Sequence, residues 1–107
     1  MRRGEVWTLS GTGYAGKPRP AVVVQDDRFD ATASVSVCAF TTNATEAPLF
    51  RLMTEPDDHN GLRLTSRLMV DKITTVPRTR LGERIGRLAA SDLVRLNRAI
   101  AVFLGLA

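Results

Sequence analysis

The chain has 107 residues, of which 44% are hydrophobic and 24% charged, a composition that excludes an intrinsically disordered protein and predicts one globular domain over residues 1–107. It contains no apolar run long enough to span a bilayer, so we expect a cytoplasmic protein without a membrane segment. The net charge is +4, and thirteen of the fifteen cations are Arg, whose planar fork of donors matches phosphate. The charge is therefore consistent with a nucleic-acid partner and equally with a merely solvated basic surface.

The first half of the chain predicts short strands joined by turns. We expect strands over residues 5–9, 21–25 and 34–41, where apolar residues alternate or run continuously. The 21–25 strand is almost wholly apolar, which predicts burial on both of its faces. A Gly-rich loop over 10–18 and a polar turn over 26–32, with room for one helical turn, connect these strands.

The middle of the chain continues the same pattern. We expect strands over residues 49–53 and 65–71, and the second of these continues over 72–76 after a bulge. Residues 55–61 (EPDDHNG) have the composition of a turn. A last short strand is expected over residues 84–88.

The hydrophobic period then changes to that of a helix. Ser91 is the expected N-cap and Asp92 the acid of the first turn, and Gly105 ends the helix. One apolar face is predicted at spacings of three and four, formed by Leu93, Leu96, Ile100, Phe103 and Leu104. Short strands followed by one helix predict a mainly β fold with α, in which a small barrel is partly covered by the helix.

Several common kinds of active site are excluded. The only histidine is His59, so a two-histidine ribonuclease mechanism is impossible and no Ser–His–Asp arrangement can be argued. Cys38, the only cysteine, lies in an alternating apolar segment and is predicted to be a core residue rather than a nucleophile. Asp57 and Asp58 precede His59 in a Pro- and Gly-containing turn, which favours a solvated turn over a metal site. We therefore expect no metal and no cofactor.

The remaining candidates carry guanidinium and hydroxyl groups. Arg19 lies between Pro18 and Pro20, which hold the backbone extended at the start of a strand. A guanidinium held in this way can stabilise charge that develops on a phosphate, and its alternative is an ordinary surface cation. Thr41 and Thr42 end the 34–41 strand, where their hydroxyls can donate to a phosphate oxygen or serve only as local caps.

Five segments, taken in order, resemble the MazF/PemK/Kid toxin family. They are RRGEVW, KPRPAVVVQDD, VSVCAFTT, SRLMVDKITTVPRTRL and the helix that ends in LGL. The resemblance implies a small SH3-like β-barrel with a C-terminal helix, of the CcdB/PemK-like kind, assembled as a homodimer. That fold agrees with the order of strands and helix expected from the residue pattern.

The resemblance also implies an activity. Most members of that family are toxins of type II toxin–antitoxin systems. The resemblance implies a sequence-specific, metal-independent endoribonuclease that cuts single-stranded RNA, including mRNA, by attack of a 2′-hydroxyl. The products are a 2′,3′-cyclic phosphate and a 5′-hydroxyl, and a partner antitoxin blocks the RNA groove. By resemblance, the catalytic residues are Arg19 and Thr41, and the loop over 10–18 is a flap over the groove. The supporting RNA contacts are Lys17, Thr42, Ser66 and Asp71.

The sequence departs from the family pattern at two places. The loop over 10–18 lacks the acid-rich stretch that is common in the family, so base preference does not carry over. Met69 stands where some members carry an Arg, so no catalytic role is expected there. Asp71, which matches the family's acid, is either a general base or a buried structural acid.

Two other functions compete with the nuclease. CcdB-type toxins share the barrel and bind DNA gyrase without cutting RNA, but they depend on an aromatic, glycine-containing C-terminus. This chain ends in FLGLA with no Trp there, which favours the nuclease. The third alternative is a catalytically inactive RNA-binding protein.

Overall fold

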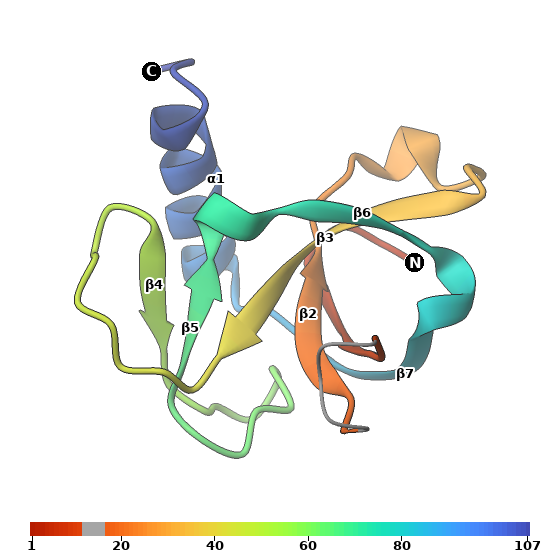
Figure 1. The fold of residues 1–107 in the computed structure, drawn as a ribbon, viewed down its shortest axis with the longest axis horizontal. Coiled ribbons are helices and arrows are strands. Elements are labelled where there is room, and N and C mark those ends of the chain that lie inside the picture. Colours follow the sequence, from red (N-terminus) through yellow and green to blue (C-terminus); the bar gives the residue numbers. More distant parts are fainter. Residues whose placement is uncertain (12–16) are drawn as a thin grey trace.

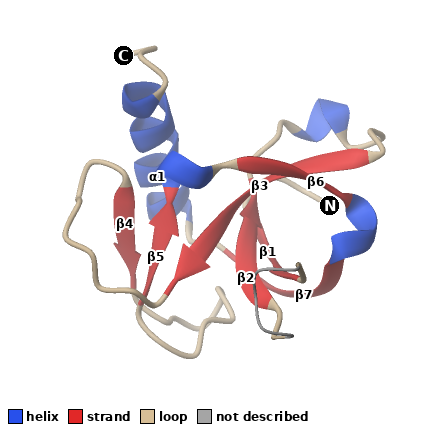
Figure 2. Ribbon diagram, in the orientation of Figure 1, coloured by secondary structure: helices blue, strands red, loops and turns tan. Residues whose placement is uncertain are grey.

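A computed structural model of the chain describes residues 1–11 and 17–107 (Figure 1). The described part is mainly β, with one long helix at its C-terminal end (Figure 2). The strands are β1 (Glu5–Leu9), β2 (Arg19–Val23), β3 (Ser34–Thr41), β4 (Arg51–Thr54), β5 (Ser66–Met69), β6 (Thr74–Pro77) and β7 (Leu81–Arg87). The helix is α1 (Ala90–Phe103), and single 3₁₀ turns lie at η1 (Asp27–Phe29), η2 (Val70–Lys72) and η3 (Arg78–Arg80).

The strands form one antiparallel sheet organised around β3. The order is β4-β5-β3-β2-β1-β7, and β6 pairs with β3 beside this path. The N-terminal half of β3 pairs with β6 and its C-terminal end with β5, while β2 lies on its other edge. The fold class is confirmed, but no pairing between described strands joins β4 to β7, so the predicted barrel is not closed by hydrogen bonds.

The sheet separates two clusters of buried side chains, because residues along β2 and β3 alternate between its faces. One cluster, the helix-side core, contains Val22, Cys38 and Phe40, and Leu96 of α1 packs into it. The other, the strand-side core, contains Val23, Val35, Val37 and Ala39 with side chains from β1, β6 and β7. Both faces of β2 are therefore buried, as its apolar sequence predicts.

Helix α1 covers the helix-side core beside η2 and β4 (Figure 1). Leu96 has no exposed surface, and the Phe103 ring lies 6.2 Å from the ring of Phe50. Leu93 and Ile100 pack against the same core, as predicted, but Phe103 and Leu104 remain about half exposed, at 48% and 60%. None of the described helices is both long and apolar enough to cross a membrane.

Two predicted details of this region are wrong. Ser91 is not the N-cap, because α1 begins at Ala90 and Ser91 lies inside its first turn. The cap position is Ala89, whose side chain makes no capping hydrogen bond. The interruption expected near residue 71 is not a bulge within one strand but the 3₁₀ turn η2, which directs β5 and β6 to different halves of β3. Asp92 in the first turn and Gly105 just beyond the helix, with a positive φ of 74°, agree with prediction.

Candidate active site

The ends of β2 and β3 bring Arg19 and Thr41 together. The two strands pair with Ala21 opposite Ala39, and continuing that register by two residues sets Arg19 opposite Thr41. Side chains opposite one another in an antiparallel pair share a face of the sheet. Pro20 lacks an N–H and cannot donate to a neighbouring strand, so the β2–β3 ladder ends here and the strands separate.

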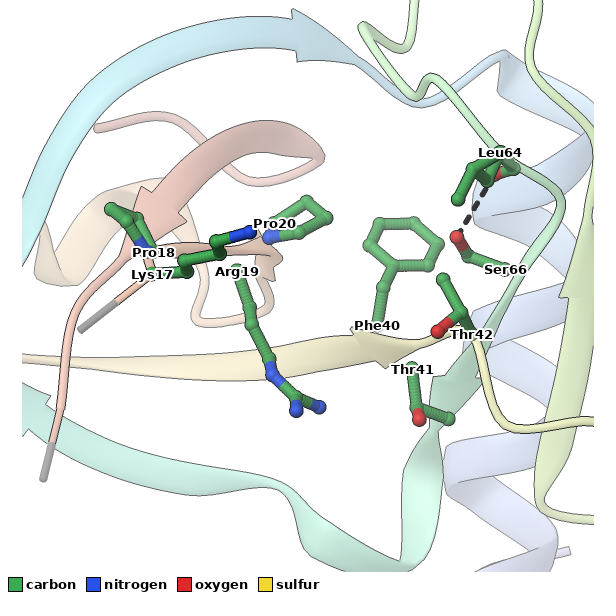
Figure 3. Close-up of a pocket in the computed structure, with 9 residues that line it drawn as sticks. All are labelled: Lys17, Pro18, Arg19, Pro20, Phe40, Thr41, Thr42, Leu64 and Ser66. Atoms are coloured by element: carbon green, nitrogen blue, oxygen red, sulfur yellow. Dashed lines mark hydrogen bonds between the residues drawn. The ribbon is translucent and has the colours of Figure 1, made fainter. Parts of the chain in front are cut away.

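A pocket of about 560 Å³ opens where these strands separate. Figure 3 shows Arg19 and Thr41 extending the same way from β2 and β3, while Pro20 and Phe40 face each other beside them. The lining residues are Lys17, Pro18, Arg19, Pro20, Phe40, Thr41, Thr42, Leu64 and Ser66. Five of the six predicted site residues, all except Asp71, therefore line one pocket.

The pocket combines positive charge with hydroxyl groups on a buried apolar base. Lys17 and Arg19 are exposed, and no described lining residue is acidic. Phe40 is 1% exposed and forms the base, whereas Thr41 accepts the backbone N–H of Asn43 at 3.2 Å through its Oγ1. That contact uses a lone pair of the hydroxyl, so its proton can still be donated to a ligand. The arrangement suits an oxyanion such as phosphate.

Asp71 lies outside this pocket and is bound to Arg51. Its two carboxylate oxygens accept from Nε and Nη2 of Arg51 at 2.7 and 3.0 Å, a bidentate pair in which both side chains are mostly buried. The hydrogen bonds from Arg51 outweigh the effect of burial and lower the pKa of Asp71 below its ordinary value. This geometry favours the structural interpretation of Asp71, whose RNA-binding role remains an untested prediction.

Replacing Asp71 by Asn should destabilise the protein in a pH-dependent way. A carboxylate whose pKa is lowered by folding contributes stability above its unfolded pKa, and this contribution is lost as the pH falls through the folded pKa. We expect Asp71→Asn to lower the free energy of unfolding by about 1–3 kcal/mol at pH 7, with the gap to wild type narrowing below about pH 4. Urea unfolding of wild type and variant at pH 7 and below about pH 4 measures this difference. A difference in unfolding free energy that is the same at both pH values would contradict the prediction.

The other polar groups considered from sequence have structural surroundings. Cys38 is fully buried, and burial raises the pKa of its thiol to about 12, which keeps it protonated and unreactive. Asp57 accepts the backbone N–H groups of His59 and Asn60, both at 2.8 Å, as the predicted turn requires. Among residues 1–11 and 17–107, no cluster of three or more His, Cys, Asp or Glu side chains could hold a metal ion.

Sequence reasoning missed the apolar half of the pocket. Phe40 and Leu64 line it although neither had been singled out, and Leu64 comes from a segment more than forty positions beyond Arg19. Leu64 is 64% exposed, which is unusual for a leucine and would have drawn attention to it. A single sequence does not show which leucines are exposed, so it could not identify Leu64. Of the predicted flap over 10–18, residues 12–16 lie outside the described part of the chain.

Comparison with known proteins identifies the family. The family model described as the PemK-like, MazF-like toxin of type II toxin–antitoxin systems matches residues 2–104. The chain belongs to the PemK/MazF toxin family. A probable endoribonuclease MazF of Mycolicibacterium smegmatis is 57% identical over 108 residues, covering 100% of this chain and 99% of that protein. Endoribonuclease MazF9 of Mycobacterium tuberculosis is 31% identical over 99% of this chain and 98% of its own length.

Solved structures agree with this assignment. An endoribonuclease from a mycobacterial species, in complex with its cognate antitoxin, matches with a TM-score of 0.82 and 28% identity, covering 100% of this chain and 97% of that one. A second mycobacterial endoribonuclease matches with a TM-score of 0.78 and 26% identity over 99% of this chain and 92% of the other. The family resemblance drawn from five sequence segments is thus confirmed for this PemK/MazF-family chain.

Proposed function

We propose that this PemK/MazF-family toxin is a metal-independent endoribonuclease that cleaves single-stranded RNA, including mRNA, in the cytoplasm. The observation that carries the proposal is the convergence of Arg19, Thr41 and Lys17 on one pocket, in which none of the described lining residues is acidic. The names of the relatives, two of them endoribonucleases MazF, support an activity on RNA. They do not favour the CcdB-type alternative of gyrase binding.

In the proposed reaction, the 2′-oxygen loses its proton and attacks the adjacent phosphorus, and the bond to the 5′-oxygen breaks as that oxygen gains a proton. The products are a 2′,3′-cyclic phosphate and a 5′-hydroxyl, and no water is consumed in this step. Negative charge builds on the non-bridging oxygens, where the guanidinium of Arg19 and the hydroxyl of Thr41 donate hydrogen bonds. Arg19 stays protonated at neutral pH, so it stabilises charge and does not act as the base.

Incubating the purified chain with a mixed-sequence single-stranded RNA in EDTA tests this function. We expect cleavage in EDTA, because the proposed chemistry needs only the side chains of the pocket. An RNA left intact with or without added Mg²⁺ would instead support an RNA-binding or gyrase-binding protein. Cleavage that EDTA abolishes would refute metal independence while leaving the nuclease assignment in place.

We also propose a homodimer, built on the exposed apolar side of α1. One rim of α1, Leu93–Leu96–Ile100, packs within the chain, so only its exposed rim is available to a partner. That surface carries Val94 and Val102, 47% and 53% exposed. The exposed apolar residues that continue it are Phe103, Leu104 and Leu106.

Light scattering should give a dimer mass for the wild type at micromolar concentration. Val102→Glu should shift the protein toward the monomer, because it places a charge in the centre of an apolar contact. Asn97→Glu, at an exposed position of the same helix, is the matched control and should leave the mass unchanged. A monomer mass for the wild type would overturn the dimer.

A cognate antitoxin is the second proposed protein partner. The cationic pocket would accept an acidic or amphipathic segment lying over Lys17 and Arg19, which would exclude RNA. Reversing both charges, with Lys17→Glu and Arg19→Glu, should greatly weaken the affinity for the antitoxin. An unchanged dissociation constant would contradict occlusion of this pocket.

A further inference from the structure

A second pocket of about 470 Å³ adjoins the first. The two share Pro18, Pro20, Thr42, Leu64 and Ser66 as lining residues, so they form one continuous depression. An RNA strand with its scissile phosphate at Arg19 would therefore place a neighbouring nucleotide in the second pocket. The far wall of this pocket comes from two segments, the loop that contains Gly61–Leu64 and the strand β7.

A β-bulge directs Glu83 to this pocket. Trp7 pairs with Arg84 and Leu9 with Leu81, so Gly82 and Glu83 together oppose the single residue Thr8. The backbone N–H of Glu83 donates to Oγ1 of Thr8 at 2.9 Å, and a Cβ on Gly82 would lie only 2.7 Å from that oxygen. Bulges commonly re-aim a side chain beside a binding site, and here the re-aimed group is a carboxylate.

The loop that carries Arg63 is held firmly against β7. Asn60 is fully buried and hydrogen-bonds to Glu55, Asp57 and Leu62. Gly61 has a φ of +73°, and a Cβ there would lie 2.2 Å from the carbonyl oxygen of Ile85, so only glycine allows this close approach. The wall of the second pocket is thus preorganised rather than adaptable.

Arg63 and Glu83 are the only charged residues among the described residues that line the second pocket. Both are exposed, and neither forms an ion pair or side-chain hydrogen bond with another residue of 1–11 or 17–107. The exposed side chain of Leu64 and the ring of Pro20 add apolar surface between the two pockets. A donor, an acceptor and an apolar surface are the elements that recognise a nucleobase.

We propose that the second pocket selects a guanine or cytosine next to the cleaved phosphate. Glu83 accepts a hydrogen bond from the amino group of the base, and Arg63 donates to its carbonyl oxygen. Guanine and cytosine carry an amino group at one end of the Watson–Crick edge and a carbonyl at the other. In adenine the acceptor N1 adjoins the amino group, and in uracil the donor N3–H lies between two carbonyls, so neither base places a donor and an acceptor at opposite ends of this edge. This inference rests on the proposed endoribonuclease function.

The test uses cleavage of a short single-stranded RNA of randomised sequence, followed by sequencing of the products. Wild type should prefer G or C at one position beside the cut. Glu83→Gln and Arg63→Ala should each reduce that preference on the order of 10- to 100-fold, at that position alone. Asp30→Asn and Arg28→Ala change the same charges at exposed positions away from both pockets and should leave the preference unchanged.

The possible outcomes distinguish a failure of this inference from a failure of the proposed endoribonuclease function. If wild type cuts RNA but prefers A or U beside the cut, or if both variants keep the wild-type preference, the base-reading role is wrong and the nuclease stands. If Arg63→Ala instead reduced cleavage equally for all RNA sequences and made cleavage less sensitive to salt, Arg63 would contact a phosphate and base reading would also be wrong. If wild type does not cut RNA, the proposed function fails and this inference fails with it.

Discussion

Arg19→Ala is expected to reduce the rate of RNA cleavage by about two to three orders of magnitude. The crowded phosphorus centre of the transition state carries more charge than the substrate, and removing one preorganised donor from such a site typically costs about 3–4 kcal/mol. The effect should appear in kcat, because Arg19 interacts most strongly with charge that is absent from the ground state. Single-turnover cleavage of a defined RNA measures it.

The accompanying variants distinguish geometry from charge. Arg19→Lys should recover little activity, since an ammonium cannot reproduce the planar fork of a guanidinium. Thr41→Val removes one hydroxyl and keeps the shape, so its cost should be smaller, on the order of tenfold. Arg28→Ala, at an exposed position of η1, is the control for loss of a cation. A folded Arg19→Ala protein that cuts at the wild-type rate would remove Arg19 from the reaction.

Asn60→Leu is expected to lower the free energy of unfolding by about 3–5 kcal/mol. The substitution keeps the branched shape and the number of side-chain heavy atoms but leaves the N–H groups of Asp57 and Leu62 and the carbonyl of Glu55 without their partner. Each unsatisfied buried group costs about 1–3 kcal/mol. Urea unfolding measures the change. The Asn60→Leu protein should also discriminate less between bases beside the cut, because the loop that contains Asn60 positions Arg63 and Leu64 at the second pocket.

Asn97→Leu provides the matched control for this substitution. Asn97 is exposed on α1, so the same chemical change there should alter stability by no more than about 0.5 kcal/mol. A loss below about 1 kcal/mol for Asn60→Leu would mean that water replaces the lost partner in the loop. The preorganised wall described for the second pocket would then be wrong.

The strands were predictable where side-chain alternation reports burial, and less so elsewhere. The range of β3 was predicted correctly because SVSVCAFT alternates between two buried faces. The start of β7 was missed by three residues, since Gly82 and Glu83 lie at a bulge and lack the apolar signature of a strand. The cap of α1 was misassigned because a local preference for Ser does not decide where the chain leaves β7.

The candidate site was predictable where its residues are marked by their neighbours in the sequence. The prolines on either side of Arg19 and the hydroxyls that end β3 are visible in the sequence, and the structure brings them to one pocket. The pairing of Asp71 with Arg51 was not predictable, because residues twenty positions apart meet through the β4–β5 pairing, in which Arg51 lies opposite Met69. Glu83 and Arg63 were missed for the same reason, since only the tertiary fold brings them to one pocket.

The most direct test of the central claim is cleavage of two oligonucleotides that differ in one atom. One is an RNA with a mapped cleavage site, and the other carries a single 2′-deoxy sugar at the nucleotide whose 2′-hydroxyl would attack. The proposed mechanism predicts that wild type cuts the first in EDTA, leaving a cyclic phosphate and a 5′-hydroxyl by mass spectrometry, and leaves the second intact at that site. Equal cleavage of the two oligonucleotides would contradict attack by the 2′-hydroxyl and with it the role assigned to the Arg19 pocket.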